Sequence, residues 1–302
     1  MNPQALIDGL IAGAMIGLGA IGVTLTYAIL RFANFAHGEF ITTGAYLSLA
    51  IAGALAATLG AVAPLSPFSI TWVLVLAFAG AMAGTGLVAI LLDLALFRPL
   101  RRRGASVIIT VIASFGASLA LRSLIEFVFT AKPAYFTREL QIAMPLFGGM
   151  RATPDQLLIL GLTVVLVVAT HLLLTRSDAG RAMRAVAEDP ALAKVCGIDV
   201  ERVVRLTWLL GGALAAAAGI SAGLLVQVRP TMGFDLLLPL FAAAILGGIG
   251  SVPGAMLGGL VVGLCEAMAA QTVGAEWRAA VSFVVLIAVL ALRPRGLFGV
   301  RA

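Results

Sequence analysis

Residues 236–270 read LLLPLFAAAILGGIGSVPGAMLGGLVVGLCEAMAA, an apolar stretch that glycines and a proline interrupt at 247–254 (GGIGSVPG). A helix needs about 20 mainly apolar residues to cross a membrane. Glycine and proline interrupt such a helix, because proline lacks an N–H and glycine adopts conformations outside the helical region. The stretch therefore predicts two short helices around an unwound centre.

Apolar stretches also fill most of the chain before and after this segment. The composition is 61% hydrophobic and 11% charged over 302 residues, with a mean hydropathy of +1.10, whereas a soluble domain has about 25% charged residues. The sequence predicts an all-α membrane protein: one transmembrane domain over 1–302, a polytopic helical bundle of about eight or nine membrane-crossing elements with broken helices. The other expected spans are roughly 6–30, 41–61, 70–97, 107–128, 154–174, 206–228 and 279–292.

The basic residues predict how the chain is oriented. If the N-terminus lies outside, 14 of the 20 lysines and arginines fall in cytoplasmic segments: Arg31, four at 98–103, six at 175–205 and three at the C-terminus. Five fall outside and Arg122 lies within a span. Cytoplasmic segments of membrane proteins are enriched in Lys and Arg. We therefore expect a cytoplasmic loop at 175–205 and an extracytoplasmic loop at 129–153. Because the basic residues lie between the spans, the net charge of +6 does not indicate nucleic-acid binding.

The 175–205 loop contains the signals of a short capped helix. Asp189 precedes Pro190 as an N-cap, and Gly197 follows as a left-handed terminator, which predicts a helix over 190–196. Leu192, Val195 and Cys196 share one face of that helix, and Asp199 can cap the helix that follows. Such a helix is suited to docking into a groove of a partner protein. The alternative is a helix that lies at the membrane interface.

Two polar interruptions of the apolar sequence are candidates for a transport pathway. One is residues 31–40, with Asn34, Phe35, His37, Gly38 and Glu39, and the other is the break with Gly247, Gly248, Gly250 and Ser251. Paired interruptions indicate a solute pathway at the interface of two halves. For Asn34 and His37 a role in capping or water contact is an equal alternative. A structural cap or hinge is favoured for Glu39, and close glycine packing is the alternative for the second break.

Other polar groups in the spans are expected to be structural. Arg122 and Glu126 are one turn apart and can pair with each other. Glu266 is expected to bond to a neighbouring helix, and Asp93 to a basic partner.

The sequence shows neither a catalytic motif nor a metal-binding cluster. Cys196 and Cys265 are far apart, and His37 and His171 form no ligand set with them. A Walker phosphate loop requires Gly-Lys-Ser/Thr, and neither lysine of the chain has that context. We therefore expect no bound cofactor or metal and no enzymatic activity, with any ATP site on a partner subunit.

Four motifs in order resemble one known family. They are NFAHGEF at 34–40, AED at 187–189 leading to GID at 197–199, LGGIGS at 246–251 and RPRGLFG at 293–299. They are similar to the branched-chain amino acid ABC transporter permeases of the LivH type, and the resemblance covers about 6–299. It implies an importer permease fold in a bacterial inner membrane.

The resemblance also implies partner proteins: a second permease subunit that is homologous or identical, two cytoplasmic ATP-binding subunits and a periplasmic solute-binding protein. The family's ATPase-coupling loop corresponds here to Glu188, Asp189, Ala193 and Gly197, to which the docking analysis adds Leu192 and Asp199.

The expected substrate is a branched-chain or other aliphatic amino acid. Because the sequence shows no acid–base pair facing the pathway, we expect a weakly binding, hydrated passage, with selectivity left to the external binding protein. The alternatives are a permease for urea or short amides and an ion-coupled transporter that uses Glu39 or Glu266. A membrane-embedded enzyme is disfavoured.

Overall fold

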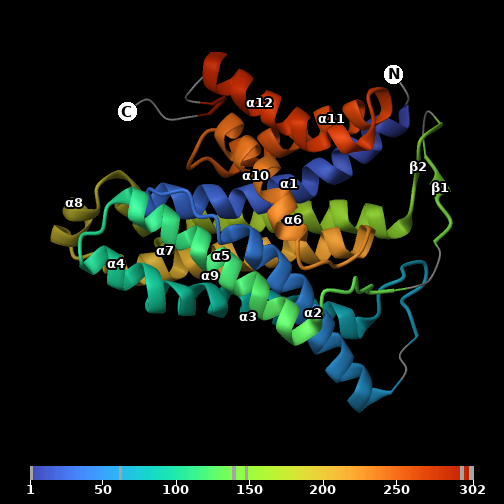
Figure 1. Ribbon diagram of the computed structural model, residues 1–302, viewed down its shortest axis with the longest axis horizontal. Coiled ribbons are helices and arrows are strands. Elements are labelled where there is room, and N and C mark those ends of the chain that lie inside the picture. The colour runs from blue at the N-terminus through green and yellow to red at the C-terminus, as the bar shows by residue number, and fades with distance from the viewer. Residues whose placement is uncertain (1–2, 61–62, 138–140, 147–148, 293–295, 299–302) are drawn as a thin grey trace.

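The structure is a computed structural model and describes residues 3–60, 63–137, 141–146, 149–292 and 296–298. Helices dominate it (Figure 1). In chain order they are α1 (Pro3–Leu30), α2 (His37–Leu59), α3 (Trp72–Leu92), α4 (Arg98–Arg102), α5 (Val107–Phe129), α6 (Pro154–Arg176), α7 (Asp178–Glu188), α8 (Pro190–Val195), α9 (Val200–Leu225), α10 (Met232–Gly247), α11 (Val252–Thr272) and α12 (Arg278–Leu292). A π-helical turn, Asp93–Phe97, joins α3 to α4, a 3₁₀ turn, Ala275–Trp277, precedes α12, and strands β1 (Met144–Pro145) and β2 (Arg151–Ala152) form an antiparallel hairpin.

Length and composition confirm the expected membrane bundle. In the described part of the chain, eight helices are long and apolar enough to cross a membrane, with α3, the π turn and α4 counted as one and the 3₁₀ turn counted with α12. The apolar helix α10, with 16 residues, is shorter. Together these agree with the prediction of eight or nine membrane-crossing elements.

The break near 250 lies where the sequence predicts it, but its two arms are unequal. Helix α10 ends at Gly247 and α11 begins at Val252. The second arm is not short, because α11 continues for 21 residues and is itself long enough to span a membrane. Nothing in the apolar sequence after the break interrupts it before Gly274, which has a φ of +129°.

Helix α1 is the most buried of the candidate spans and packs against α11 through glycine. In the most apolar part of α1, 72% of the residues are buried. A Cβ atom added at Gly259 would lie 2.3 Å from the Cα of Gly17, and one at Gly263 would lie 2.3 Å from the nitrogen of Gly13. Glycine is required at these contacts because the two backbones touch, which is the usual way in which membrane helices approach closely.

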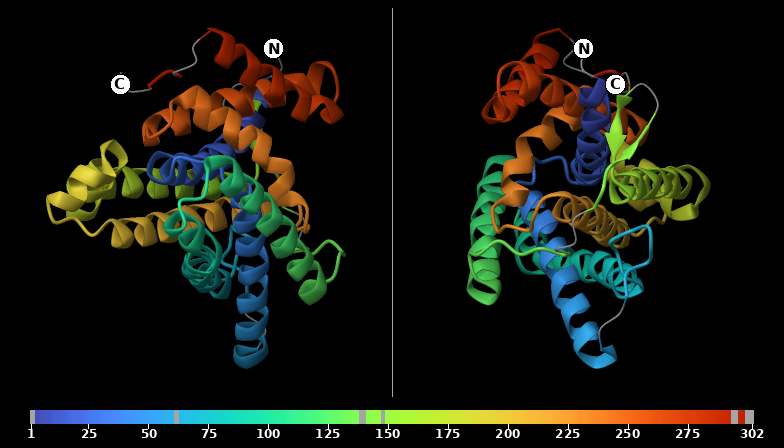
Figure 2. Two further views of the ribbon diagram at one scale, coloured as in Figure 1. Left: turned by 60° about the vertical axis from the view of Figure 1, so that its left-hand side comes forward. Right: turned by 90° about the vertical axis from the view of Figure 1, so that its right-hand side faces the viewer.

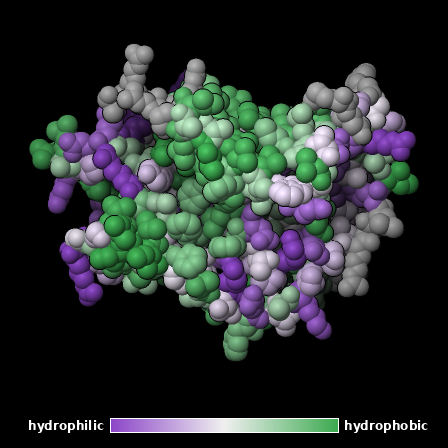
Figure 3. All heavy atoms as spheres, turned by 45° about the horizontal axis from the view of Figure 1, so that its top comes forward, coloured by the Kyte–Doolittle hydropathy of each residue, from purple (hydrophilic) through white to green (hydrophobic). Residues whose placement is uncertain are grey.

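The segments rich in Lys and Arg gather at one end of the molecule. Helices α4, α7 and α8 lie together at the left of Figure 1, and the β1–β2 hairpin lies at the opposite end. Figure 2 shows α7 and α8 protruding from the bundle. Hydrophobic residues fill the upper middle of the face shown in Figure 3, with hydrophilic residues toward its left and right sides and over its lower centre. This distribution suits a protein whose middle contacts lipid.

Candidate functional site

The first break places the start of α2 inside the bundle. The chain leaves α1 at Leu30, and Arg31 reverses its direction with a φ of +57°. His37, the first residue of α2, donates from Nε2 to the carbonyl of Gly19 at 3.2 Å, and its Nδ1 is buried without a partner. Gly19 lies about three turns before the end of α1. The 31–36 segment therefore turns back along α1, and α2 begins partway along its neighbour.

The residues that precede α2 are largely packed rather than exposed. Asn34 is only 3% exposed, and its Oδ1 accepts from the N–H of Ala36 at 3.1 Å, which is a local turn-forming bond. Its Nδ2 is buried without a partner. The ring of Phe35 contacts those of Phe115 and Phe241, with centroids 6.1 and 5.8 Å away. Asn34 therefore forms a local turn before α2 without capping the helix, and its amide nitrogen remains free for another bond.

The first turn of α2 also contacts the start of α10. A Cβ atom at Gly38 would lie 2.6 Å from the carbonyl oxygen of Gly233. The N–H of Gly233 donates to Thr42 Oγ1 at 3.1 Å. The N-termini of α2 and α10 therefore meet.

Glu39 forms an ion pair that the sequence analysis did not anticipate. Its side chain is completely buried, and its Oε1 accepts from Arg122 Nη2 at 2.6 Å and from Ser118 Oγ at 3.2 Å. The expected pairing of Arg122 with Glu126 is wrong, because the break brings Glu39 to the middle of α5, where Arg122 reaches it. The sequence analysis expected no acid–base pair facing the pathway, whereas Glu39, one of the candidate pathway residues, is paired with Arg122.

The second break contains two left-handed glycines and a capped helix start. Gly248 has a φ of +93° and Gly250 a φ of +91°, which favour glycine at both positions. The N–H of Gly250 donates to Thr24 Oγ1 at 2.7 Å, and Ser251 caps α11 by accepting from the N–H of Gly254 at 3.1 Å. A Cβ at Gly247 would lie 2.2 Å from Gly254 backbone atoms. Gly247 thus serves close packing, whereas Gly250 is exposed.

Part of the closing 293–299 motif meets this break, and the rest of the motif lies outside the described residues. The N–H of Leu297 donates to the carbonyl of Leu246 at 2.8 Å, and that of Phe298 to the carbonyl of Gly247 at 3.2 Å. These bonds satisfy carbonyls that the helix end leaves free.

Both breaks meet the same short stretch of α1. His37 contacts Gly19 and Gly22, and Gly250 bonds to Thr24. Residues more than 200 positions apart in the sequence are therefore linked through about one and a half turns of one buried helix. The arrangement matches transporters in which discontinuous helices face each other at the solute site.

The predicted docking helix has the expected caps. Asp189 Oδ1 accepts from the N–H groups of Ala191 and Leu192 at 2.8 and 3.1 Å. Gly197 has a φ of +86°, and Asp199 caps α9 by accepting from the N–H of Arg202 at 3.0 Å. Helix α8 therefore begins and ends as the sequence predicts.

The outer face of α8 is apolar. Leu192 is 61% exposed and Val195 is 85% exposed, and Cys196 next to them is exposed as well, whereas Ala193 is buried against the bundle. Arg31 Nη2 donates to the carbonyls of the last two residues of α7, Ala187 at 3.0 Å and Glu188 at 2.9 Å. The end of α7, directly before α8, is thus bonded to the first break.

Two other predicted polar contacts are confirmed. Ser282 on α12 donates a hydrogen bond to Glu266. Arg101 donates to both carboxylate oxygens of Asp93, at 2.5 and 3.1 Å.

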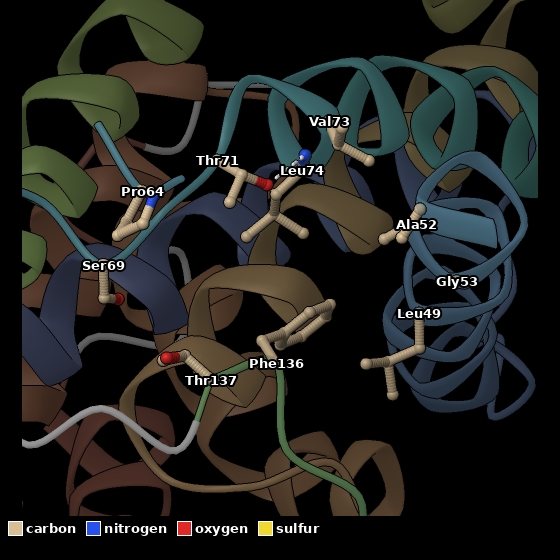
Figure 4. Close-up of a pocket in the computed structure, with 11 residues that line it drawn as sticks. Leu49, Ala52, Gly53, Pro64, Ser69, Thr71, Val73, Leu74, Phe136 and Thr137 are labelled. Atoms are coloured by element: carbon tan, nitrogen blue, oxygen red, sulfur yellow. Dashed lines mark hydrogen bonds between the residues drawn. The ribbon is translucent and has the colours of Figure 1, made fainter. Parts of the chain in front are cut away.

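A cavity of about 380 Å³ lies away from both breaks (Figure 4). It is bounded by α2, the start of α3 and the segment around Phe136. Its hydroxyl groups have partners: Thr71 caps α3, and Ser69 donates to Asp155. Among the residues that the structure describes, the lining includes no charged side chain; it is made of Leu49, Ala52, Gly53, Ala56, Pro64, Ser69, Thr71, Val73, Leu74, Phe136 and Thr137.

Sequence reasoning missed four residues of the site: Thr24, Ser118, Arg122 as the partner of Glu39, and Phe234, whose ring centroid lies 4.6 Å from the Arg122 guanidinium carbon. One usable signal was present, since a lone arginine and a lone carboxylate in neighbouring spans require partners. Thr24, Ser118 and Phe234 carry no such signal.

The fold and the two breaks define a multi-pass membrane protein of the transport-permease class. The chain belongs to the family of branched-chain amino acid transport system permease components, whose pattern matches residues 5–290.

Relatives of similar length share this pattern. The chain is 35% identical to the branched-chain amino acid permease protein BraD of Pseudomonas aeruginosa, over 98% of this chain and 95% of that one. It is 34% identical to LivH of Escherichia coli over the same shares, and 28% identical to a probable LivH of Methanocaldococcus jannaschii over 99% and 94%. The solved structure of PsaBC from Streptococcus pneumoniae in complex with Fab has a similar fold, with a TM-score of 0.51, 14% identity and coverage of 97% of this chain and 94% of that one.

Proposed function

We propose that this chain is the membrane-spanning subunit of an ATP-driven importer for branched-chain or other aliphatic amino acids in a bacterial inner membrane. In this proposal the whole chain acts as one permease domain. It pairs with a second permease subunit, binds two ATP-binding subunits at the α7–α8 end and receives solute from a periplasmic binding protein. The chain itself holds neither ATP nor a metal.

One observation carries the proposal: the capped helix α8 presents an apolar face at the end of the molecule where the basic segments gather. Leu192 and Val195 are mostly exposed there, beyond a span end marked by four arginines at 98–103. An exposed apolar face on a short, well-capped helix fits a groove on a partner protein. In the orientation that positive charge favours, that partner is cytoplasmic, as an ATP-binding subunit would be.

The contact between α7 and the first break would transmit a movement of the docked helices to the pathway. Because Arg31 donates to the last carbonyls of α7, a movement of α7–α8 on ATP binding would pull on the turn that leads to Asn34 and His37. On the opposite side the 129–153 segment, with the β1–β2 hairpin, would face the binding protein. Asn34, Phe35, His37, Gly38 and Glu39 would then line the route together with Gly247, Gly248, Gly250 and Ser251.

The names of the relatives favour amino acids over urea or short amides as the substrate. BraD and LivH are described as branched-chain amino acid permeases, and they match nearly the whole chain. An ion-coupled mechanism would need a carboxylate free to bind a proton or sodium. The Arg122 cation beside Glu39 opposes the binding of a proton or sodium ion there, and Glu266 is bonded to Ser282, which makes this alternative weaker.

The test is co-purification of the ATP-binding subunits with Leu192→Asp, together with leucine uptake into proteoliposomes. A charge on the docking face should reduce both to background. Ile142→Asp, at an exposed apolar position outside the spans in the 129–153 segment, is the matched control for added charge and should retain the ATP-binding subunits. Undiminished co-purification and uptake in Leu192→Asp would refute docking through α8, and uptake of urea without leucine would refute the substrate.

A further inference from the structure

The ion pair between Glu39 and Arg122 is only half satisfied. Glu39 Oε1 accepts from both Arg122 and Ser118, whereas Oε2 is buried without a partner. On the other side of the pair, Arg122 Nε is also buried without an acceptor. A buried polar atom without a partner is unfavourable, and here one carboxylate oxygen and one guanidinium N–H remain available for a ligand.

The same chain contains an ion pair that shows what a purely structural pair looks like. Asp93 and Arg101 form two bonds, one to each carboxylate oxygen, at 2.5 and 3.1 Å. Both oxygens of the acid are used there. Buried pairs that only hold helices together can be replaced by apolar residues with little loss of stability, so the incomplete pair at Glu39 calls for another explanation.

The guanidinium can be reached from the surface of the chain, and the carboxylate lies behind it. The Arg122 side chain is 18% exposed and that of Glu39 is 0% exposed. Phe234 in the first turn of α10 covers the guanidinium, with its ring centroid 4.6 Å from the guanidinium carbon, and is itself 41% exposed. The three residues come from α5, α2 and α10, and two of these helices begin at this point.

We infer that Glu39, Arg122 and Phe234 form a binding site for the zwitterionic head of a free α-amino acid, an inference that rests on the proposed function. The substrate carboxylate would bind Arg122, and its ammonium would bind the free oxygen of Glu39. The aliphatic side chain would lie against Phe234. When the ligand inserts between Glu39 and Arg122, its ammonium and its carboxylate replace the two partners of the ion pair. Neither protein charge is then left uncompensated.

This arrangement also explains how the membrane subunit would discriminate between solutes. Urea and short amides carry no charge and cannot replace either partner of the pair. An amine or a carboxylic acid alone would leave one buried charge without a partner, which is strongly unfavourable. Selectivity for amino acids would then lie partly in the permease and not only in the external binding protein.

The experiment measures binding of radiolabelled L-leucine to the complete, nucleotide-free complex in nanodiscs without the binding protein. The variants are Glu39→Gln and Arg122→Gln. Each should weaken leucine binding at least tenfold. Glu266→Gln is the matched control, because Glu266 is another buried carboxylate in a span but bonds to Ser282 instead of a cation; its affinity should stay within twofold of the wild type. The competitors 3-methylbutylamine and 4-methylpentanoate, which each lack one charge, should displace leucine at least tenfold less well than valine does.

Unchanged leucine affinity in both neutral variants, or equal competition by the amine, would overturn the site while leaving the proposed function intact. A wild-type complex that transports urea and not leucine would refute the proposed substrate instead. If the neutral variants do not assemble, Arg122→Lys provides the test instead, because it keeps a cation beside Glu39. Lysine lacks the planar fork that holds a carboxylate with two bonds, so this variant should assemble and bind leucine at least threefold less tightly; wild-type affinity there would also overturn the proposal.

Discussion

Single polar side chains connect elements that the sequence keeps far apart. Thr24 accepts a hydrogen bond from the N–H of Gly250, and Arg122 donates one to Glu39. Water is absent from the interior of a membrane bundle, so the protein itself must supply these hydrogen-bond partners. A few specific hydrogen bonds therefore fix the breaks, in addition to the close packing at Gly38 and Gly247.

Thr24→Val should destabilise the chain by about 0.5–1.5 kcal/mol, because it removes the hydrogen bond that links Gly250, an exposed residue of the break, to the buried helix α1. The measurement is the thermal unfolding midpoint of the purified chain in detergent. Thr26→Val is the matched control: Thr26 is also buried in α1, but its hydroxyl bonds only to carbonyls of its own helix, those of Gly22 and Val23. Equal midpoints for the two variants would show that the bond to Gly250 contributes nothing.

At the scale of the element, α8 is the clearest case of local sequence deciding structure. Its start, its end and its apolar face all follow from Asp189, Gly197 and the spacing of Leu192 and Val195. Helix α2 is the opposite case: its starting point depends on contacts with α1 and α10, and Ala36 before it provides no side-chain cap.

Gly197→Val should abolish solute-stimulated ATP hydrolysis by the assembled importer while the chain still inserts into the membrane. Gly197 has a φ of +86°, and no atom lies within 4 Å of the added Cβ, so the effect comes from backbone strain of about 1–2 kcal/mol that shifts the end of α8. Gly104→Val imposes similar strain at a φ of +64° in an equally open turn outside the docking segment. Hydrolysis should survive in Gly104→Val, and survival in Gly197→Val as well would contradict the role of this helix end.

At the scale of the whole molecule, the two breaks frame one region around the buried helix α1. Gly250 is exposed and Asn34 is 3% exposed in the conformation described. A transporter of this design exposes its central site to one side of the membrane at a time. Position 250 should therefore be more accessible than position 34 in this conformation, and the order should reverse as the importer cycles.

Cysteines at positions 34 and 250 test this in a background with Cys196→Ser and Cys265→Ser. Gly250→Cys should react readily with a small polar thiol reagent in the nucleotide-free complex, and Asn34→Cys slowly. Trapping ATP should change both rates by several-fold, which mass spectrometry of the labelled chain can follow. Two cysteines that stay inert in every state would favour the capping and packing interpretations of the breaks.

The sequence by itself determined the class of fold, the positions of nearly all spans, both breaks and the capped helix α8. These features depend on local properties: apolar length, left-handed glycines and capping side chains within a few residues. Only the tertiary structure decided which polar groups meet. It paired Arg122 with Glu39 instead of Glu126, linked Thr24 to Gly250 and joined Arg31 to α7. The physical reason is that a buried charge takes whichever partner the packing of several helices brings within reach, and that distance is not encoded in the spacing along any one of them.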